Sequence, residues 1–275
     1  MDIRYKMIAV DMDGTLLKSD KTIHQDSVRD MQTAAANGIH VVYCTGRALS
    51  ELQSYFKVLP TVKYAICYSG AIVYDCMKNR CIYRAEIEQK LIKKIVETAK
   101  KKKAMVHFLT ERESIVASSD VMHMDDFHMG IYQPMFMEVT RKVRDMEEES
   151  KLHDSIAKVN LYFRSAEDRS DGFDELKQLP LTFAFAEKAS LEMTALCVNK
   201  ATGLERLAEY LQIPLSQVVG IGDADNDRDM LRKVGFSVAM GNAGDDIKDG
   251  CDFVTKDNDH NGVGEAIQHI ISDML

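Results

Sequence analysis

A chain of 275 residues is long enough for two domains, and a composition of 45% apolar and 28% charged residues is that of a soluble globular protein. The formal net charge of −8 argues against a general nucleic-acid-binding protein, which would carry a basic surface. No apolar run approaches the length that crosses a bilayer, and the charged start of the chain does not resemble a signal peptide. The six cysteines form no CxxC pair and lie mostly in apolar runs, which is typical of reduced thiols. We therefore expect a cytoplasmic protein with no nucleic-acid or membrane partner.

Strand-like and helical patterns alternate through the first third of the chain. A short apolar run is followed by a helical pattern that stops at Asn37-Gly38, a common helix terminator. A β-branched run comes next, and the cycle then repeats before a hairpin pattern. We expect strands at 7–10, 39–44 and 64–68, helices at 25–36 and 49–59, and hairpin strands at 71–75 and 81–84. Such repetition favours a parallel sheet with right-handed crossovers.

The middle of the chain has a different pattern, which favours an antiparallel α+β unit. There we expect helices at 87–103, 136–149 and 167–179, and strands at 104–109, 114–118, 156–163, 181–185 and 191–194. The last part returns to the first pattern, with helices at 202–211, 225–233 and 263–275 and strands at 217–222, 236–240 and 252–255. The sequence thus predicts an α/β domain, residues 1–84 and 195–275, that is interrupted by an inserted α+β domain, residues 85–194.

Polar side chains follow three of the predicted strands, and one Lys precedes a predicted helix. In chain order they are Asp11 and Asp13, the pair Thr45-Gly46, Lys200 and the run Gly222–Asp227. Each has an ordinary structural explanation, as a solvated turn, a helix cap or a surface charge. However, burying an unpaired carboxylate is costly, so paired carboxylates where a core strand ends indicate a bound cation or a catalytic task.

Two kinds of metal site are compatible with acidic runs of this type. Starting at Asp223, the spacing resembles an EF-hand, but the positions that require Gly and Glu hold Arg228 and Val234; starting at Asp11, the last ligand position holds Thr22. Both calcium interpretations therefore fail. Carboxylates at two strand ends instead form a hard oxygen site suited to Mg²⁺, while a hydroxyl, backbone N–H groups and a Lys hold phosphate oxygens. One carboxylate can then act as a nucleophile, with a neighbour as acid and base.

Taken in order, these stretches resemble the four motifs of the haloacid dehalogenase superfamily. The residues that carry the resemblance are Asp11 to Leu17, Thr45-Gly46-Arg47, Lys200, and Gly222-Asp223 with Asn226-Asp227, together with Ser69-Gly70-Ala71, 239–243 and Gly262-Val263. The match is closest to the Cof-type phosphatases, which carry a large α+β cap between the second and third motifs. The resemblance implies a three-layer Rossmann-like parallel sheet core with an inserted α+β cap, and Mg²⁺ as the cofactor.

The resemblance also implies a role for each matching residue. Asp11 would be the nucleophile and a Mg²⁺ ligand, and Asp223 a further ligand. Asp13 would protonate the leaving alkoxide and then activate the attacking water, and its backbone carbonyl would also bind the metal. Lys200 would offset negative charge on the phosphate and the nucleophile. Asp227 would orient Lys200 or a metal-bound water.

Two further groups of residues would bind the substrate. The phosphate-binding groups would be the Met12 N–H, the Thr45 hydroxyl, the Gly46 N–H, Lys200 and Asn226. The remaining contacts to substrate are assigned to Arg47, Ser69 and Gly70. Family members often have Asn where Ser69 stands and a different small residue at Cys44, but neither position supplies a carboxylate or the Lys.

The inserted residues 85–194 would close over the site and set its specificity. The stretch Met122–Met129 is dense in His, Asp and Met, but His123 and His128 are five residues apart and do not share a helix face as a metal-binding pair does. We expect a loop whose polar groups partly face the cleft. Lys158 interrupts an apolar strand and points either to solvent or to the cleft.

The leading hypothesis is a Mg²⁺-dependent phosphatase that hydrolyses small phosphorylated metabolites, such as sugar phosphates, through an aspartyl-phosphate. The alternative is a phosphomutase of hexose phosphates, because the same aspartyl-phosphate can return its phosphoryl group to another hydroxyl. A third hypothesis is a non-catalytic ligand-sensing protein. Loss of Asp11, Asp13 or Lys200 would favour the third, but all three are present. We expect a monomer or a homodimer.

Overall fold

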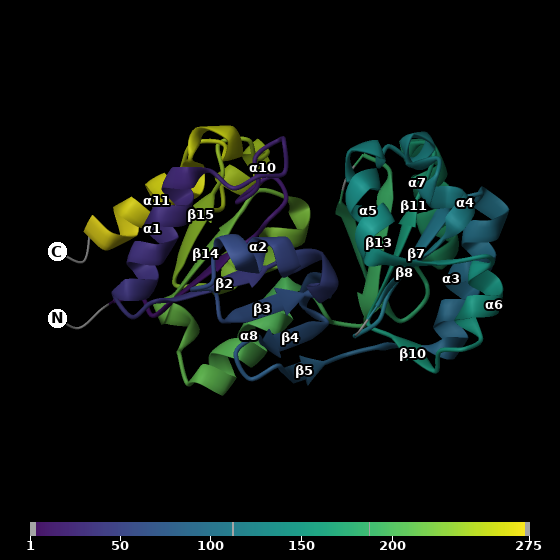
Figure 1. Cartoon of the computed structure of the whole chain (residues 1–275), viewed down its shortest axis with the longest axis horizontal. Coiled ribbons are helices and arrows are strands. Elements are labelled where there is room, and N and C mark those ends of the chain that lie inside the picture. Colours follow the sequence, from purple (N-terminus) through teal and green to yellow (C-terminus); the bar gives the residue numbers. More distant parts are fainter. Residues whose placement is uncertain (1–3, 112, 187, 273–275) are drawn as a thin grey trace. The chain divides into compact units, whose positions relative to one another are not determined.

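The structure is a computed structural model that describes residues 4–111, 113–186 and 188–272. The chain forms two compact units. Unit 1 contains the described residues 4–46, 53–83 and 199–272, and unit 2 contains Arg47–Leu52 and the described residues from Arg84 to Val198. Figure 1 shows that each unit is built on a sheet of its own with helices packed against it.

The sheet of unit 1 has eight described strands in the order β16-β15-β14-β1-β2-β3-β4-β5. From β16 to β3 every neighbouring pair is parallel, and β3 and β4 are antiparallel. The strands are β1 (Met7–Val10), β2 (His40–Cys44), β3 (Tyr64–Cys67), β4 (Ile72–Asp75), β5 (Arg80–Arg84), β14 (Val218–Gly222), β15 (Phe236–Ala239) and β16 (Phe253–Val254). The parallel sheet predicted from the sequence is therefore confirmed.

Helices cover both faces of this sheet, so unit 1 has three layers (Figure 1). Buried residues of α8 and α9 pack against apolar side chains of one face, while α1 and α11 pack against each other. The helices are α1 (Gln25–Ala36), α2 (Gln53–Val58), α8 (Lys200–Leu211), α9 (Arg228–Lys233), α10 (Asp245–Lys248) and α11 (Gly262–Ser272). The bounds of α1 agree with the prediction, because Asn37 caps it and Gly38 supplies the positive φ of 85° that a helix end often needs. Residues 273–275 of the predicted last helix lie outside the described residues.

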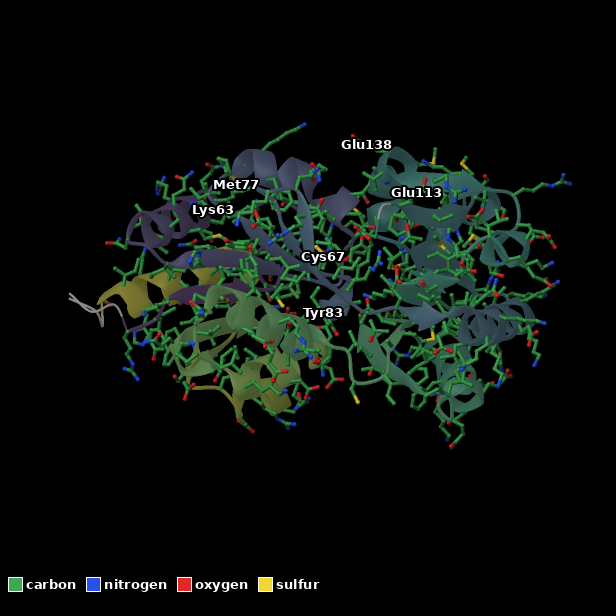
Figure 2. The ribbon with its side chains drawn as sticks, turned by 90° about the horizontal axis from the view of Figure 1, so that it is seen from below. Lys63, Cys67, Met77, Tyr83, Glu113 and Glu138 are labelled. Carbon is green, nitrogen blue, oxygen red and sulfur yellow. The ribbon has the colours of Figure 1, made fainter. Side chains whose placement is uncertain are left out.

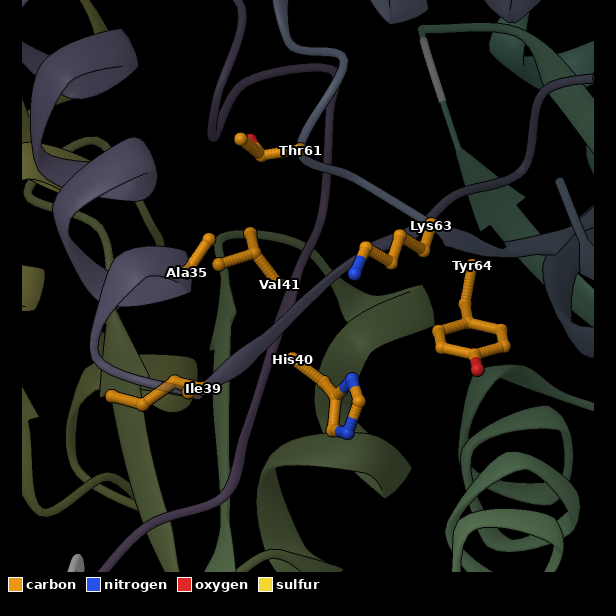
Figure 3. A pocket seen from close by; sticks show the side chains of 8 residues that line it. Ala35, Ile39, His40, Val41, Thr61, Lys63 and Tyr64 are labelled. Carbon is orange, nitrogen blue, oxygen red and sulfur yellow. The ribbon is translucent and has the colours of Figure 1, made fainter. Parts of the chain in front are cut away.

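The carboxyl ends and the amino ends of the parallel strands differ in the residues that lie there. β1 lies between β2 and β14, so the carboxyl ends of these three strands meet at one edge, where Asp11, Thr45 and Asp223 follow them. At the amino ends of β2 and β3, residues of the strands and of α1 line a small cavity of about 110 Å³ (Figure 3). That cavity contains none of the motif residues. Cys67, the last residue of β3, is buried. Met77, which lies between β4 and β5, is exposed; both residues are labelled in Figure 2.

The sheet of unit 2 has six described strands in the order β12-β13-β11-β7-β8-β9. All pairs are antiparallel except β8 and β9. These strands are β7 (Met105–Leu109), β8 (Ser114–Ala117), β9 (Thr140–Val143), β11 (Lys158–Tyr162), β12 (Leu181–Ala186) and β13 (Ser190–Ala195); β6 (Ile87–Glu88) and β10 (Ser155–Ile156) form a separate pair. The helical segments are η1 (Leu49–Leu52), α3 (Gln89–Lys102), α4 (Ser118–Val121), η3 (Met124–Phe127), η4 (Gly130–Tyr132), α5 (Gln133–Val139), α6 (Met146–Ser150) and α7 (Ala166–Leu176).

One predicted helix of this unit is wrong. Residues 136–149 form the end of α5, then β9, then the start of α6. The hydroxyl of Thr140 donates to the carbonyl of Phe136 at 2.6 Å where α5 ends, and the next residues pair with β8. Asp145 then caps α6 by accepting from the N–H groups of Glu147 and Glu148. The partner strand decides the conformation of residues 140–143, and it is not visible in a local helical pattern.

The two faces of the unit 2 sheet have different side chains, because alternate residues of a strand point to opposite faces. On one face, apolar residues of β7, β11 and β13 pack with α3 and α7. On the other face β11 carries Lys158, Asn160 and Tyr162, which lie opposite Thr194, Glu192 and Ser190 of β13. In the part of the chain that the structure describes, no helix is both long and apolar enough to span a bilayer.

Candidate active site

Two strand ends of unit 1, those of β1 and β14, bring the predicted acidic residues together. Asp11 directly follows β1, is 4% exposed, and donates its N–H to the carbonyl of Ile221 in β14 at 3.0 Å. Asp223 directly follows β14. Gly14, with a φ of 79°, turns the chain back beside it, and a Cβ at this position would lie 2.4 Å from Asp223 Oδ2. A glycine is therefore required for the two acidic loops to approach one another.

Lys200 begins α8 and is almost completely buried between two carboxylates. Its Nζ donates to Asp11 Oδ1 at 2.5 Å and to Asp227 Oδ1 at 2.6 Å. The preceding residue, Asn199, caps the helix by accepting from the N–H of Thr202 at 3.0 Å. Gly70 packs directly on Asn199, since a Cβ on Gly70 would lie 1.8 Å from the Asn199 carbonyl oxygen. The position of the Lys200 ammonium thus depends on a helix cap and on a glycine of a distant turn.

Asp227 completes an acidic cluster with Asp11 and Asp223. One potential ligand oxygen from each of the three carboxylates lies within 4.8 Å of the others. The second oxygen of Asp227 accepts from the N–H groups of Asp223 and Ala224, each at 3.1 Å, and the hydroxyl of Thr15 donates to Asp223 Oδ1 at 2.7 Å. These hydrogen bonds hold the carboxylates of Asp223 and Asp227 in place, while one oxygen of each lies close to the other members of the cluster.

Burial and mutual repulsion dominate the electrostatics of this cluster. Burial, followed by the charge of Asp227, raises the pKa of Asp11 well above its ordinary value, and the same two causes raise the pKa of Asp223 to about 6. Burial alone would lower the pKa of Lys200, but the carboxylates of Asp11 and Asp227 raise it well above its ordinary value. When all three are ionised, the carboxylates and one ammonium leave an excess of two negative charges in a largely buried place.

The donor set fits a divalent hard cation. Mg²⁺ prefers carboxylate and carbonyl oxygens, takes few protein ligands and keeps waters or phosphate oxygens in its other positions. An ion of charge +2 would balance the excess charge and lower the raised pKa values of Asp11 and Asp223. Among the residues that would hold it, Asp11 and Asp223 belong to the cluster, and Asp13 would use its backbone carbonyl.

The carboxylate of Asp13 lies outside the cluster. It accepts from Lys21 Nζ at 3.0 Å and is 29% exposed, so it is accessible, whereas Asp11 is not. Met12, which follows Asp11, and Thr45 are both buried, and Thr45 donates its N–H to the carbonyl of Ile66 at 2.8 Å. Met12 and Thr45, two of the residues named as phosphate-binding groups, thus lie in loops that follow the neighbouring strands β1 and β2.

Two of the proposed substrate contacts have a structural task in unit 1. Ser69 has a φ of 53° and donates its N–H to the carbonyl of Thr45 at 3.0 Å, and Gly70 supports Asn199 as described above. Asn226 presents a buried Oδ1 that accepts no hydrogen bond from the residues the structure describes. That oxygen is available to a ligand or water, whereas Ser69 and Gly70 fix neighbouring loops.

Sequence reasoning missed three residues that support the site. Thr15 donates to Asp223, Lys21 pairs with Asp13, and Asn242 donates to the carbonyl of Gly14 at 2.8 Å. Thr15 lies within the first motif, so its position was visible in the sequence. Asn242 lies within residues 239–243, which also carry the resemblance, although that resemblance gave it no role; Lys21 lies outside the motifs, and no local pattern identifies it.

The residues singled out in the inserted segment are built into unit 2. Lys158 is fully buried and forms an ion pair with Glu192 at 2.7 Å. His128 has a φ of 59° and its Nε2 lies 2.9 Å from the carbonyl of Arg164, which itself pairs with Asp126. The stretch Met122–Met129 is therefore not one open loop, because its middle forms η3 and Met124, Phe127 and Met129 join a buried cluster, whereas Met122 is exposed.

The sheet of unit 1 and the carboxylates at its strand ends are of the haloacid dehalogenase type. The chain belongs to the family of haloacid dehalogenase-like hydrolases, whose sequence pattern it matches over residues 8–267. The Cof-type resemblance is confirmed, and the protein is a phosphatase by family.

Similar proteins cover almost the whole chain. Phosphatase YwpJ of Bacillus subtilis is 28% identical, with 97% of this chain and all of the relative aligned. The 5-amino-6-(5-phospho-D-ribitylamino)uracil phosphatase YcsE of the same organism is 27% identical over 98% of this chain and 96% of the relative. A solved structure described as the subclass IIB sugar phosphatase BT4131 has the same fold, with a TM-score of 0.83 at 23% identity over 96% of this chain and 98% of the other.

Proposed function

We propose that the protein hydrolyses small phosphorylated metabolites, in particular sugar phosphates, with Mg²⁺ and through an aspartyl-phosphate on Asp11. The observation that carries this proposal is the buried Lys200, which pairs with Asp11 and Asp227, two of the three carboxylates of the cluster. A structural ion pair needs one carboxylate for each cation. The excess negative charge is explained if a divalent cation completes the site, and that cation would let an anionic phosphoryl group approach the carboxylates.

The first half of the reaction uses Asp11 and Asp13. A carboxylate oxygen of Asp11 attacks phosphorus and forms the acyl-phosphate, while the bond from phosphorus to the leaving oxygen breaks. Asp13, which is partly exposed and not committed to the cluster, gives its proton to the leaving alkoxide. Lys200 holds Asp11 in place and offsets its charge, so the attacking oxygen keeps one orientation.

The second half reverses the proton transfer. The Asp13 carboxylate takes a proton from a water, whose oxygen attacks phosphorus and releases inorganic phosphate and the free carboxylate of Asp11. When bound, Mg²⁺ supplies charge neutralisation that lets a phosphate dianion approach the carboxylates. The N–H groups of Met12 and Gly46, the Thr45 hydroxyl and Asn226 would bind the phosphoryl oxygens, and Asp227 keeps Lys200 in position.

Unit 2 supports a polyhydroxyl substrate. Its polar sheet face offers both donors and acceptors, and Asn160 Oδ1 and Ser190 Oγ are buried without a hydrogen-bond partner among the described residues. Since Glu192 already matches the charge of Lys158, this face favours neutral hydroxyl groups over a second anion. We propose residues 1–84 and 195–275 as the catalytic core and 85–194 as the specificity cap.

The assay compares a carboxylate of the acidic cluster with an exposed carboxylate outside it. Phosphate release from a panel of sugar phosphates and from an aryl phosphate is measured with and without Mg²⁺ for the wild type, Asp11→Asn and Asp225→Asn. Asp225 follows Asp223 in the same acidic run, but it is exposed and pairs with Arg228 at 2.9 Å. We expect Asp11→Asn to lose at least ~10³-fold in rate and Asp225→Asn to stay within about threefold. Equal loss in both variants, or none in Asp11→Asn, would overturn the assignment.

A further inference from the structure

A short hairpin of unit 1 follows the first acidic motif. Leu17 and Ile23 pair as an antiparallel bridge, and Lys18 donates its N–H to the carbonyl of Thr22 at 2.9 Å. Within this turn Lys21 donates its N–H to the carbonyl of Lys18, also at 2.9 Å. Hydrogen bonds inside the hairpin thus fix the backbone that carries Lys21.

Two contacts with other segments of unit 1 hold the hairpin in place. Asn258 Nδ2 donates to the carbonyl of Leu17 at 2.9 Å, before the turn. The hydroxyl of Tyr55, in α2, donates to the carbonyl of Lys21 at 3.1 Å, within the turn. Since all of these residues belong to unit 1, the position of Lys21 relative to the strand ends is set within that unit.

The backbone of Lys21 adopts a conformation that is unfavourable for a lysine. Its φ of 64° lies in the left-handed region, where the Cβ of an L-residue comes too close to the following carbonyl oxygen. Glycine avoids this contact, and asparagine or aspartate tolerates it better than lysine does. The turn by itself therefore favours another residue at this position. Because backbone outliers of this kind cluster at functional sites, we expect the Lys21 side chain to have a task.

The Lys21 side chain pairs with the carboxylate of Asp13. Its Nζ donates to Asp13 Oδ1 at 3.0 Å, and the two side chains are 24% and 29% exposed. An ion pair that water reaches adds little to stability, and the left-handed backbone of Lys21 subtracts from it. Stability therefore does not explain a lysine at this position. The partner offers another explanation, because Asp13 is the residue that transfers protons in the proposed reaction.

We propose that Lys21 is a positioning residue for Asp13: it holds the carboxyl group in the orientation from which that group gives a proton to the leaving oxygen and takes one from the attacking water. The proposal rests on the proposed function, because it assumes that Asp13 is the acid and the base. A group that transfers protons must lie within hydrogen-bond reach of its partner, and a third side chain commonly orients it. Lys21 acts through Asp13 and not through the substrate.

The test measures the two halves of the reaction separately. Para-nitrophenyl phosphate, labelled in its phosphoryl group, is mixed with the full chain and Mg²⁺ in a quench-flow instrument. Release of nitrophenol reports the first half, which needs no proton from Asp13 because nitrophenolate is a stable leaving group. Loss of the label from the protein reports the second half, in which Asp13 takes a proton from the attacking water. Circular dichroism gives the unfolding midpoint of each variant.

Two variants remove the ammonium, and two others serve as controls. Lys21→Met keeps a long side chain, while Lys21→Gly also relieves the left-handed backbone. Lys18→Met makes the same change in the same hairpin, where Lys18 pairs at 2.9 Å with an exposed Asp20. Lys103→Gly relieves a backbone of the same type at the exposed end of α3, where φ is 52°.

We expect the label to remain on the protein ~10-fold longer or more in both Lys21 variants, with the release of nitrophenol within about threefold of the wild type. Both controls should leave the two rates within about twofold. Lys21→Gly should change the unfolding midpoint no more than Lys103→Gly does, because relief of the backbone offsets the greater freedom of the unfolded chain.

A purely structural role of Lys21 would slow both halves alike together with a lower midpoint, or would leave both rates unchanged, and either result would overturn the proposal. If Lys21→Gly does not fold, Lys21→Met decides by the same thresholds. A wild type that neither carries label nor releases phosphate would refute the proposed function and this proposal with it. If the wild type passes through both halves, the Lys21 variants alone decide.

Discussion

Two glycines of unit 1 provide a matched test of how Lys200 is positioned. Gly38 and Gly70 have similar positive φ values of 85° and 95°. A Cβ on Gly38 meets no atom within 4 Å among the described residues, whereas a Cβ on Gly70 would lie 1.8 Å from the Asn199 carbonyl oxygen. That oxygen must move by about 1.6 Å before the pair reaches an ordinary contact of 3.4 Å. Since Lys200 follows Asn199, Gly70→Ala also displaces the ammonium from Asp11.

The expected magnitudes separate the two variants. Backbone strain for an L-residue at such a φ costs about 1–2 kcal/mol, and the more restricted unfolded chain offsets part of it, so Gly38→Ala should cost about 1 kcal/mol and leave the activity unchanged. Gly70→Ala adds a steric clash worth about 1–3 kcal/mol. A shift of more than 1 Å at Lys200 should also reduce kcat ~100-fold.

The assay combines thermal unfolding with phosphate release from an aryl phosphate at saturating Mg²⁺. The activity is measured at a temperature at which both variants are folded. If Gly70→Ala loses no more stability than Gly38→Ala and keeps its kcat, Gly70 does not position Lys200 and the reasoning is refuted.

Three further results are expected from the charges of the site. Burial and Asp227 raise the pKa of Asp223 to about 6 from 3.8, so in metal-free protein its stabilising contribution is complete below pH 3.8 and is lost as the pH rises through 6. Mg²⁺ should therefore raise the unfolding temperature more at pH 7 than at pH 5, and an equal rise of the unfolding temperature at both pH values would contradict this expectation. Removal of the metal with EDTA should abolish activity. Lys200→Met removes the ammonium that pairs with Asp11 and Asp227. We expect kcat to fall ~10²–10³-fold. The free energy of unfolding of the metal-free protein at pH 7, measured by denaturant titration, should fall by about 3–5 kcal/mol. Thr15→Val removes the bond to Asp223 and should weaken Mg²⁺ binding ~10-fold in calorimetric titration, with kcat at saturating Mg²⁺ within about threefold of the wild type.

The sequence predicts the fold best where the determinants are local. The bounds of α1 follow from apolar spacing and from Asn37-Gly38, and the short strands of unit 1 follow from apolar runs that end in polar loops. The prediction fails at residues 140–143, where pairing with β8 overrides a helical pattern. It also gives no sign that Arg47–Leu52 packs with unit 2, because that grouping depends on contacts with distant residues.

The same distinction applies to the candidate site. Asp11, Asp223, Lys200 and Asp227 could be named because they lie at strand ends or at a helix start, and the structure brings them together. Lys158 could not be placed, since its partner Glu192 lies on a neighbouring strand and a strand pattern alone does not identify the buried face.

The covalent step on Asp11 is the central claim and can be tested by acid quench. Wild-type protein with Mg²⁺ is mixed with a substrate labelled in its phosphoryl group, quenched within one turnover, digested and analysed by mass spectrometry. We expect phosphate on Asp11, and none on the corresponding peptide of Asp11→Asn. Phosphate on another residue, or a full burst of released alcohol from enzyme that carries no label, would contradict the account.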